Sequence, residues 1–350
     1  MGAKRKAKSI RWLIASFVVF LFLPRAVRNL HLQHRLHDLR TELAACTPPT
    51  LFVHVTTCCR PHSLRRLLNS LERADYGSVL PTIDLHVEID WVPQEELGGE
   101  HERTISLARE FPWSYGLKTF RQRVQKAGLA TMWFELSIPS QRDYIMILED
   151  DVELSRHYFT FVATLHCKES ISKSSTTALC LHPNDWQIGV APKCGESSHS
   201  NLLYETPEPC NWAPVWKSSA WYEYVTWLHN MLATQRRPFV TDWNNMSYNY
   251  NAYVERGVDV QSPWVWKYNW ENSKLQVRYS FTRCRQHHRE LYFAINHKEP
   301  GTHFKKKLHL ENDPSLLEFS FEVASVHMLE SNVFKPSIFT TQMLIPRQKG

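Results

Sequence analysis

The sequence predicts an α/β fold in which helices flank a mostly parallel sheet. Between residues 51 and 165, segments with strand-like apolar patterns alternate with segments that have helical apolar stripes. One segment, Tyr144–Leu148, is apolar without a break, which is typical of a strand buried on both faces of a parallel sheet. Three consecutive carboxylates, Glu149–Asp151, follow it directly. Because open α/β sheets bind ligands at the carboxyl ends of their strands, these acids form the first candidate site.

The first fifty residues have the pattern of a membrane anchor followed by a spacer. Residues 1–11 carry a basic cluster and precede an apolar run at 12–23, which alone is too short to span a bilayer. Counting residues 10–27, with Arg11 and Arg25 extending to the headgroups, brings the segment near a full span, and the anchor is assigned to residues 12–27. Because flanking basic residues stay cytoplasmic, we expect a signal-anchor helix with all later residues lumenal. The alternative, a cleaved signal peptide, lacks a small-x-small cleavage site. Residues 28–50 are assigned to a stem, and a leucine stripe at helical spacing allows a homodimer through it: Leu32, Leu36, Leu39 and Leu43.

The folded domain is predicted to cover residues 51–305. Its first strand, Leu51–Thr56, is followed by a turn in which Pro61 is placed to begin a helix. A second strand, Ile83–Asp90, alternates apolar and polar residues and ends in an acid. The order of strands and helices fits a doubly wound sheet with right-handed crossovers. Residues 306–350 match no pattern and are assigned to a C-terminal extension.

The acidic segment allows two interpretations. Carboxylates packed together repel one another unless a cation lies among them, and hard divalent ions such as Mg²⁺ prefer oxygen ligands. The position of Glu149–Asp151 after a buried strand therefore favours a metal site. The alternative is an acidic turn that leaves the strand, with Ser155 capping a helix that begins near Arg156.

The segment Ile147–Ser155 resembles the acidic "DXD" segment of GT-A fold glycosyltransferases. It is most similar to the Glu-Asp-Asp form of N-acetylglucosaminyltransferase I and of a family-2-like group from plants, algae and protists. The strand, Arg-Pro turn and helix at residues 51–71 resemble the opening of these families, and Leu291–Phe304 resembles their closing motif. The resemblance implies a GT-A domain that uses Mn²⁺ or Mg²⁺ to hold the diphosphate of a nucleotide sugar, a UDP-sugar rather than a GDP-sugar.

The same resemblance implies a cellular location and a reaction. The enzyme would lie in the Golgi or ER membrane as a single-pass type II protein with its catalytic domain in the lumen. It would transfer a hexosyl or N-acetylhexosaminyl group to a glycan or glycoprotein acceptor, with inversion at the sugar carbon. Inversion comes from the resemblance alone and is not visible in the residues.

Residue roles follow from the same match. Asp151 is implied to bind the metal, with Glu149 and Asp150 orienting the ribose or a metal-bound water. Asp90 is implied to contact the nucleobase or ribose, although aspartate is also common where strands turn. Residues 118–133 resemble the helix before the acidic strand. Basic residues on it are implied to face the diphosphate, with an exposed helix charge as the alternative: Lys118, Arg121 and Arg123.

The late part of the chain supplies candidates for a further metal ligand and for the base. In the closing motif, His297 or His303 is implied to be an additional metal ligand, although a single histidine is usually structural. An inverting enzyme also needs a carboxylate base for the acceptor hydroxyl; we prefer Asp242 to Glu255. Asn251 stands where the relatives place a glutamate before an Arg-Gly pair. This departure supports the alternative of a non-catalytic GT-A relative that binds glycans or partner proteins in the Golgi.

Charge, glycine content and cysteine positions bear on other classes of protein function. The formal net charge of +6 is spread along the chain without a nucleic-acid motif, so we expect no nucleic-acid partner. A phosphotransferase would need a glycine-rich phosphate loop, and the chain has only 11 glycines and no such loop. The loop region between residues 167 and 215 contains cysteines that could form disulfides in the lumen: Cys167, Cys180, Cys194 and Cys210. A zinc site is the weaker alternative because no CxxC pair accompanies them.

Overall fold

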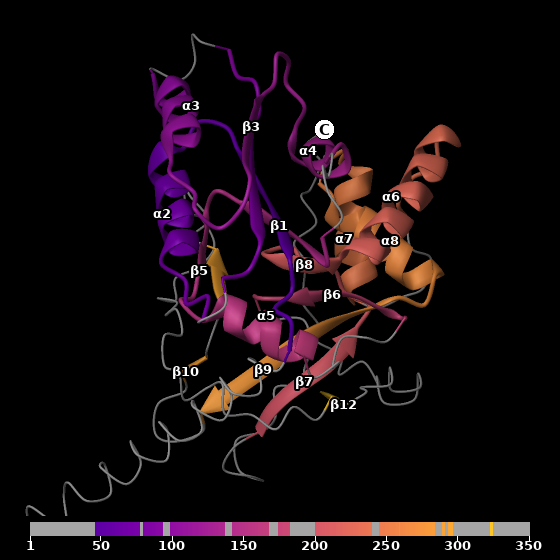
Figure 1. The fold of residues 1–350 in the computed structure, drawn as a ribbon. Coiled ribbons are helices and arrows are strands. Elements are labelled where there is room, and N and C mark those ends of the chain that lie inside the picture. The colour runs from indigo at the N-terminus through magenta and orange to yellow at the C-terminus, as the bar shows by residue number, and fades with distance from the viewer. Residues whose placement is uncertain are drawn as a thin grey trace, which may run out of the picture.

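The computed structural model describes residues 46–77, 80–93, 99–136, 142–167, 174–182, 200–239, 245–258, 260–283, 289–290, 293–296 and 323–324. Within these residues the chain forms a mixed α/β fold, in which helices flank a mostly parallel sheet (Figure 1). The predicted fold class is therefore confirmed. No helix among the described residues is long and apolar enough to cross a membrane. The predicted anchor at residues 12–27 lies outside the described residues.

Ten strands of the described chain form the main sheet, in the order β12–β7–β9–β6–β8–β4–β1–β2–β3 with β10 beside β9. Their bounds are β1 Leu51–Thr57, β2 Ile83–Ile89, β3 Lys118–Gln122, β4 Tyr144–Glu149, β6 Thr176–Cys180, β7 Ser200–Thr206, β8 Pro214–Lys217, β9 Leu275–Arg283, β10 Arg289–Glu290 and β12 Val323–Ala324. Strand β1 lies between β2 and β4 and is parallel to both, and β2 is parallel to β3. The carboxyl ends of these four strands therefore share one edge.

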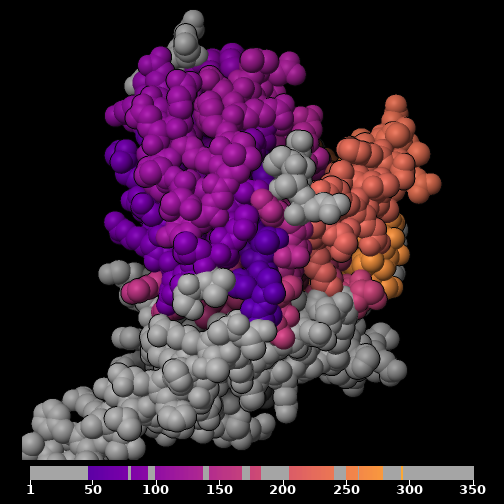
Figure 2. Space-filling view, in the orientation of Figure 1, coloured from indigo at the N-terminus to yellow at the C-terminus, as the bar shows by residue number. Residues whose placement is uncertain are grey.

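Two groups of helices cover the two faces of this sheet. Their bounds are α2 Pro61–Glu72, α3 Glu100–Glu110, α4 Leu129–Phe134, α5 Tyr158–Cys167, α6 Ser218–Ala233, α7 Asn245–Glu255 and α8 Ser262–Glu271. Alternate residues of β1 enter two separate cores, because successive side chains of a strand point to opposite faces. Leu51, Val53 and Val55 pack with α2, α3 and α5. Phe52 packs with α4, α6 and α8. Figure 2 shows residues 51–165 (indigo to magenta) and helix α6 (orange) as neighbouring parts of one surface.

Helix α2 shows how the sequence determines one of these layers. Pro61 occupies the first turn, where its missing N–H costs no helical hydrogen bond. The leucines at positions 64, 67, 68 and 71 recur at helical spacing and are all fully buried. Burying a leucine side chain contributes about 1.5–3 kcal/mol, so this stripe holds α2 firmly against the sheet.

The prediction of a helix over residues 118–133 is wrong. Lys118–Gln122 is the edge strand β3, and only Leu129–Phe134 is helical. Phe120 is half-buried and packs on the core of the α2 face, whereas Arg121 and Gln122 are exposed. Charged and polar residues of this kind are common on edge strands. Gly128 then adopts a φ of 79° immediately before α4, a backbone conformation that favours glycine.

A short second sheet joins the acidic segment to the closing motif. Strand β5 (Val152–Leu154) pairs antiparallel with β11 (Ala294–Asn296), with Asn296 opposite Val152. The acidic segment and the start of the closing motif are therefore neighbours in space. The hydroxyl of Ser155, the predicted cap, accepts the backbone N–H of His157 at 3.1 Å, and α5 begins at Tyr158.

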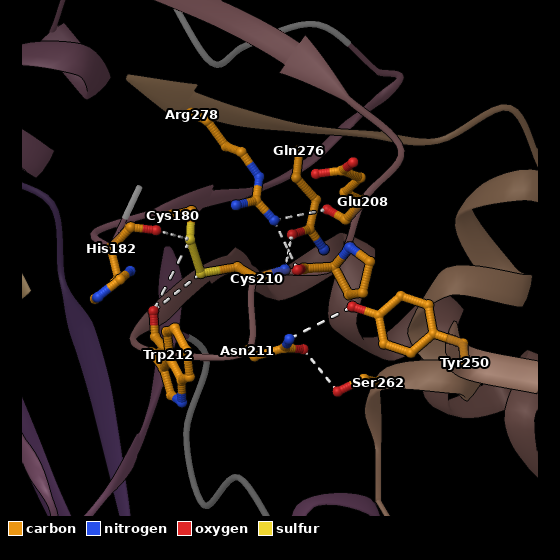
Figure 3. The surroundings of a disulfide bond; sticks show 11 residues. Cys180, His182, Glu208, Cys210, Asn211, Trp212, Tyr250, Ser262, Gln276 and Arg278 are labelled. Atoms are coloured by element: carbon orange, nitrogen blue, oxygen red, sulfur yellow. Dashed lines mark hydrogen bonds between the residues drawn. A yellow bond between two sulfur atoms is a disulfide. The ribbon is translucent and has the colours of Figure 1, made fainter. Parts of the chain in front are cut away.

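Two disulfides fasten peripheral segments to the sheet. Cys46 is bonded to Cys167 at the end of α5, and the Thr50 amide donates to Asp143 at 2.8 Å, so residues 46–50 of the assigned stem are attached to the domain. The second disulfide, Cys180–Cys210, joins the end of β6 to the loop before β8 (Figure 3). Two of the four cysteines predicted to tie the loops thus pair with each other, whereas Cys167 pairs outside that group.

Buried polar contacts hold the loop around Cys210 in place (Figure 3). The Cys210 amide donates to Gln276 at 2.6 Å, and the fully buried Arg278 donates to the carbonyl of Pro209 at 2.7 Å. Asn211 accepts a hydrogen bond from Ser262 at 2.6 Å. This loop is therefore tied to both β9 and α8.

Candidate functional site

The carboxyl ends of β1 and β4 bring the acidic segment next to the first strand-to-helix turn. The parallel register places Thr56 beside Glu149, and the Asp150 amide donates to the Thr56 carbonyl at 3.1 Å. The turn after β1 contains Arg60, which is the N-cap residue of α2. Since the sheet edge unites these segments, the acids lie where the sequence predicted a ligand site.

Asp150 is the anchor of this edge. Its side chain is fully buried and accepts hydrogen bonds from the Thr57 hydroxyl at 2.6 Å and from Arg60 Nε at 3.2 Å. Arg60 Nη2 also contacts the second Asp150 oxygen. The structure shows Asp150 holding Arg60. The predicted role of Asp150 in orienting the ribose or a metal-bound water stays a prediction.

Asp151 and Glu149 lie on either side of this ion pair. Asp151 is buried, with one oxygen 3.3 Å from Arg60 Nη1. Glu149 is the last residue of β4 and is half-buried. The guanidinium of Arg60 therefore acts as an internal counter-ion that is shared by two neighbouring carboxylates.

The acidic segment carries more negative charge than Arg60 neutralises. Burial, together with repulsion from Asp151 and Asp150, raises the pKa of Glu149 to about 8. Burial also raises the pKa of Asp150 to about 6, although Arg60 opposes this effect. The three acids do not converge as a ready set of three ligands among the described residues. Metal binding by Asp151 stays a prediction.

Asp90 lies at the same edge, because its amide donates to the Thr57 carbonyl at 2.9 Å. Its carboxylate accepts three backbone N–H groups, from Trp91 at 2.9 Å, Ala127 at 2.8 Å and Gly128 at 3.0 Å. These bonds fasten the loop before α4 to the end of β2. Contact between Asp90 and a nucleobase or ribose stays a prediction.

The basic candidates occupy different places. Lys118 begins β3, at the end opposite the acidic edge, and its ammonium donates to the Arg109 carbonyl at 2.8 Å. Lys118 therefore lies away from the acidic edge, and the contact with a diphosphate stays a prediction. Arg123 does lie at the carboxyl end of β3, but it donates to Glu88 and to Glu135, each at 2.6 Å.

The remaining candidate residues are Arg121 and the four candidates from the late part of the chain. The guanidinium of Arg121 is half exposed and lies 3.6 Å from Glu88. Glu255 is exposed at the end of α7. Asp242, His297 and His303 lie outside the described residues. Their predicted roles stay predictions.

Arg60 is the site residue that sequence reasoning missed. The chain separates it from Asp150 by 90 residues, and only the parallel pairing of β1 with β4 brings them together. One signal was present. An arginine directly before a helix-initiating proline, at the end of the first strand, stands at the edge where α/β sheets bind ligands.

Comparison with known proteins gives no family assignment. No family model matches the chain, and no curated protein matches it. Among solved structures, it is similar to a mannosyltransferase from Pyrobaculum calidifontis in complex with GDP-Man and Mn²⁺, with 14% identity over 58% of this chain and a TM-score of 0.35. It is also similar to S. aureus TarS 1-349 in complex with UDP-GlcNAc, with 10% identity over 48% of this chain and a TM-score of 0.30. The chain spans 56% of the first protein and 45% of the second.

Proposed function

We propose that this protein is a metal-dependent glycosyltransferase that moves a sugar from a nucleotide-sugar donor to a glycan or glycoprotein acceptor. The observation that carries the proposal is the cluster Glu149–Asp151 at the carboxyl end of β4, where burial and then repulsion from Asp151 and Asp150 raise the pKa of Glu149 to about 8. Such a cluster fits Mn²⁺ or Mg²⁺, with Asp151 as the protein ligand. When bound, the ion would neutralise the developing charge of the leaving nucleoside diphosphate.

The protein's own residues have separate tasks in this proposal. Asp150 holds Arg60 against the edge, and Asp90 holds the loop before α4. The side chain of Arg60 is 34% exposed, so its guanidinium can also contact an anionic group from solvent. We assign the base to Asp242 or Glu255 and inversion to the reaction. The proposal includes the type II Golgi or ER anchor at residues 12–27 and a UDP-sugar donor.

A second candidate is a non-catalytic relative that binds glycans or partner proteins. It is favoured by two observations: Asn251 lies within α7 at the position expected for a glutamate, and Asp150 and Asp90 are engaged in contacts within the protein. The acidic cluster favours the enzyme, because carboxyl groups gathered at the carboxyl end of a strand suit a divalent cation, whose charge would favour their ionised form.

Nucleotide titration of the full chain tests the proposal. Calorimetry with UDP and with GDP, with and without Mn²⁺, should show metal-dependent binding that Asp151→Asn abolishes. Glu110→Gln, an exposed acid at the far end of α3, is the matched control and should bind as the wild type does. A folded wild-type protein that binds neither nucleotide would refute the proposal. Binding without sugar turnover in the presence of acceptor glycans would favour the non-catalytic relative.

A further inference from the structure

Three side chains of metal-binding types meet on the sheet face that α4 covers, apart from the acidic segment. His54 of β1 lies beside His86 of β2 in the parallel register, and Glu88 follows two residues later on the same face. One ring nitrogen of each histidine and one carboxylate oxygen of Glu88 lie within 4.8 Å of one another. In the described part of the chain this is the one group of at least three histidine, cysteine or acidic residues that converges in this way.

Hydrogen bonds from neighbouring residues occupy one side-chain atom of His86 and one of Glu88, and leave a second atom of each side chain available as a metal ligand. His86 Nδ1 is 2.7 Å from the Thr119 hydroxyl, so a proton donated there leaves the lone pair of Nε2 for a metal. Glu88 Oε1 accepts Arg123 Nε at 2.6 Å, which leaves Oε2, the oxygen 3.5 Å from His54 Nε2. Outer contacts of this kind orient the ligands of protein metal sites.

His54 is the member that its surroundings do not explain. Its side chain is fully buried, one ring N–H lies against the Met132 carbonyl, and Nε2 is 3.5 Å from Glu88 Oε2, which is long for a hydrogen bond. Buried polar atoms are normally well paired, so the loosely paired Nε2 close to His86 and Glu88 points to a missing ligand. Neutral imidazole is the form that binds metals.

We propose that His54, His86 and Glu88 bind a divalent transition-metal ion of the Zn²⁺ class, as a structural site that joins β1 to β2. Two imidazoles and one carboxylate form a ligand set that Zn²⁺ takes readily, whereas Mg²⁺ and Mn²⁺ favour oxygen ligands. The positive charge of Arg123 beside Glu88 is offset by its second partner, Glu135. The alternative occupant of this space is no ion at all, with the two rings stacked as core residues at a centroid distance of 5.3 Å.

Cobalt binding tests this site separately from the acidic segment. The metal-free full chain is titrated with Co²⁺ alone. The amount of tightly bound Co²⁺ is measured after gel filtration, and the visible absorption spectrum shows whether the ion has few ligands and nitrogen among them. We expect one bound Co²⁺ per chain in the wild type and none in His86→Ala. Asp151→Asn should keep the bound Co²⁺, and so should His62→Ala, which removes an exposed histidine on α2. Zn²⁺ should displace Co²⁺ and raise the melting temperature of the wild type.

The outcomes separate the two sites. A folded wild type that retains no Co²⁺ or Zn²⁺, or only metal that Asp151→Asn removes, overturns this inference and leaves the glycosyltransferase proposal standing. Unchanged Co²⁺ binding in His86→Ala also overturns it. Should His86→Ala fail to fold, Thr119→Val keeps all three ligands and removes only the contact to His86 Nδ1. It should weaken Co²⁺ binding roughly 10-fold or more, and unchanged affinity in this variant contradicts the inference.

Discussion

Replacing Glu149 by glutamine should make the protein more stable at alkaline pH and leave it almost unchanged in acid. The folded state raises the pKa of Glu149 from its ordinary value of 4.5 to about 8, first by burial and then by repulsion from Asp151 and Asp150. Between these two pH values the folded protein binds more protons than the unfolded chain. Stability from this carboxyl is therefore fully present below pH 4.5 and is lost as the pH rises through 8.

The size of the effect follows from the same pKa change. At ~1.4 kcal/mol for each tenfold change in proton affinity, the ionised Glu149 carboxylate would destabilise the folded state by about 5 kcal/mol. Glu149 is half-buried, and solvent screening reduces the expected value to about 2–3 kcal/mol. Glutamine keeps the shape of the side chain and cannot ionise, so Glu149→Gln should recover this free energy at alkaline pH.

Urea denaturation at pH 4.5 and pH 8.5 measures the prediction, because the free energy of unfolding is obtained by linear extrapolation for each protein. The gain of Glu149→Gln over the wild type should grow by about 2–3 kcal/mol between the two pH values. Mn²⁺ should reduce that gain, because a cation stabilises the ionised wild-type carboxylates. Glu110→Gln is the control and should show no such growth. A gain that is the same at both pH values would refute the electrostatic reasoning.

Two other predictions concern the same edge and its attachment. Arg60→Met should lower the free energy of unfolding by about 2–3 kcal/mol in urea denaturation, because it leaves Asp150 buried without its guanidinium, whereas the exposed Arg65→Met on α2 should change it by less than about 0.5 kcal/mol. Equal effects of the two substitutions would contradict the assigned ion pair. Peptide mapping without reductant should recover Cys46 joined to Cys167, and Cys46→Ser should cost about 2–4 kcal/mol; recovery of Cys46 as a free thiol would disprove the pairing.

The strands and helices with strong periodic patterns could be predicted from the sequence. The apolar run of β4 and the leucine stripe of α2 each depend on burial that is visible in neighbouring residues of the chain. Strand β3 could not be predicted in the same way. It has one core-facing aromatic residue, Phe120, among charged residues, and charges are favourable on an edge strand as well as on an exposed helix.

The candidate site was only partly predictable for a different reason. The position of Glu149–Asp151 at a strand end is a local property, and the structure places these acids at the expected edge. The partners of Asp150 and Asp90 are not local. Arg60 is 90 residues from Asp150, and two of the three amides that bind Asp90 come from a loop more than 35 residues later. Such contacts depend on strand pairing, which a single sequence does not encode as a pattern.

Arg60 contacts two of the three acids, and the two contacts differ in geometry. Asp150 is fully buried and holds the guanidinium by two of its nitrogens. The contact with Asp151 is a single pair at 3.3 Å. Under the proposed function, a cation that takes Asp151 would compete with that single pair and leave Nη1 for an oxygen of the bound diphosphate. Arg60 would then neutralise the acids before the donor binds and the donor afterwards, which explains why a buried aspartate and a partly exposed arginine are joined at this edge.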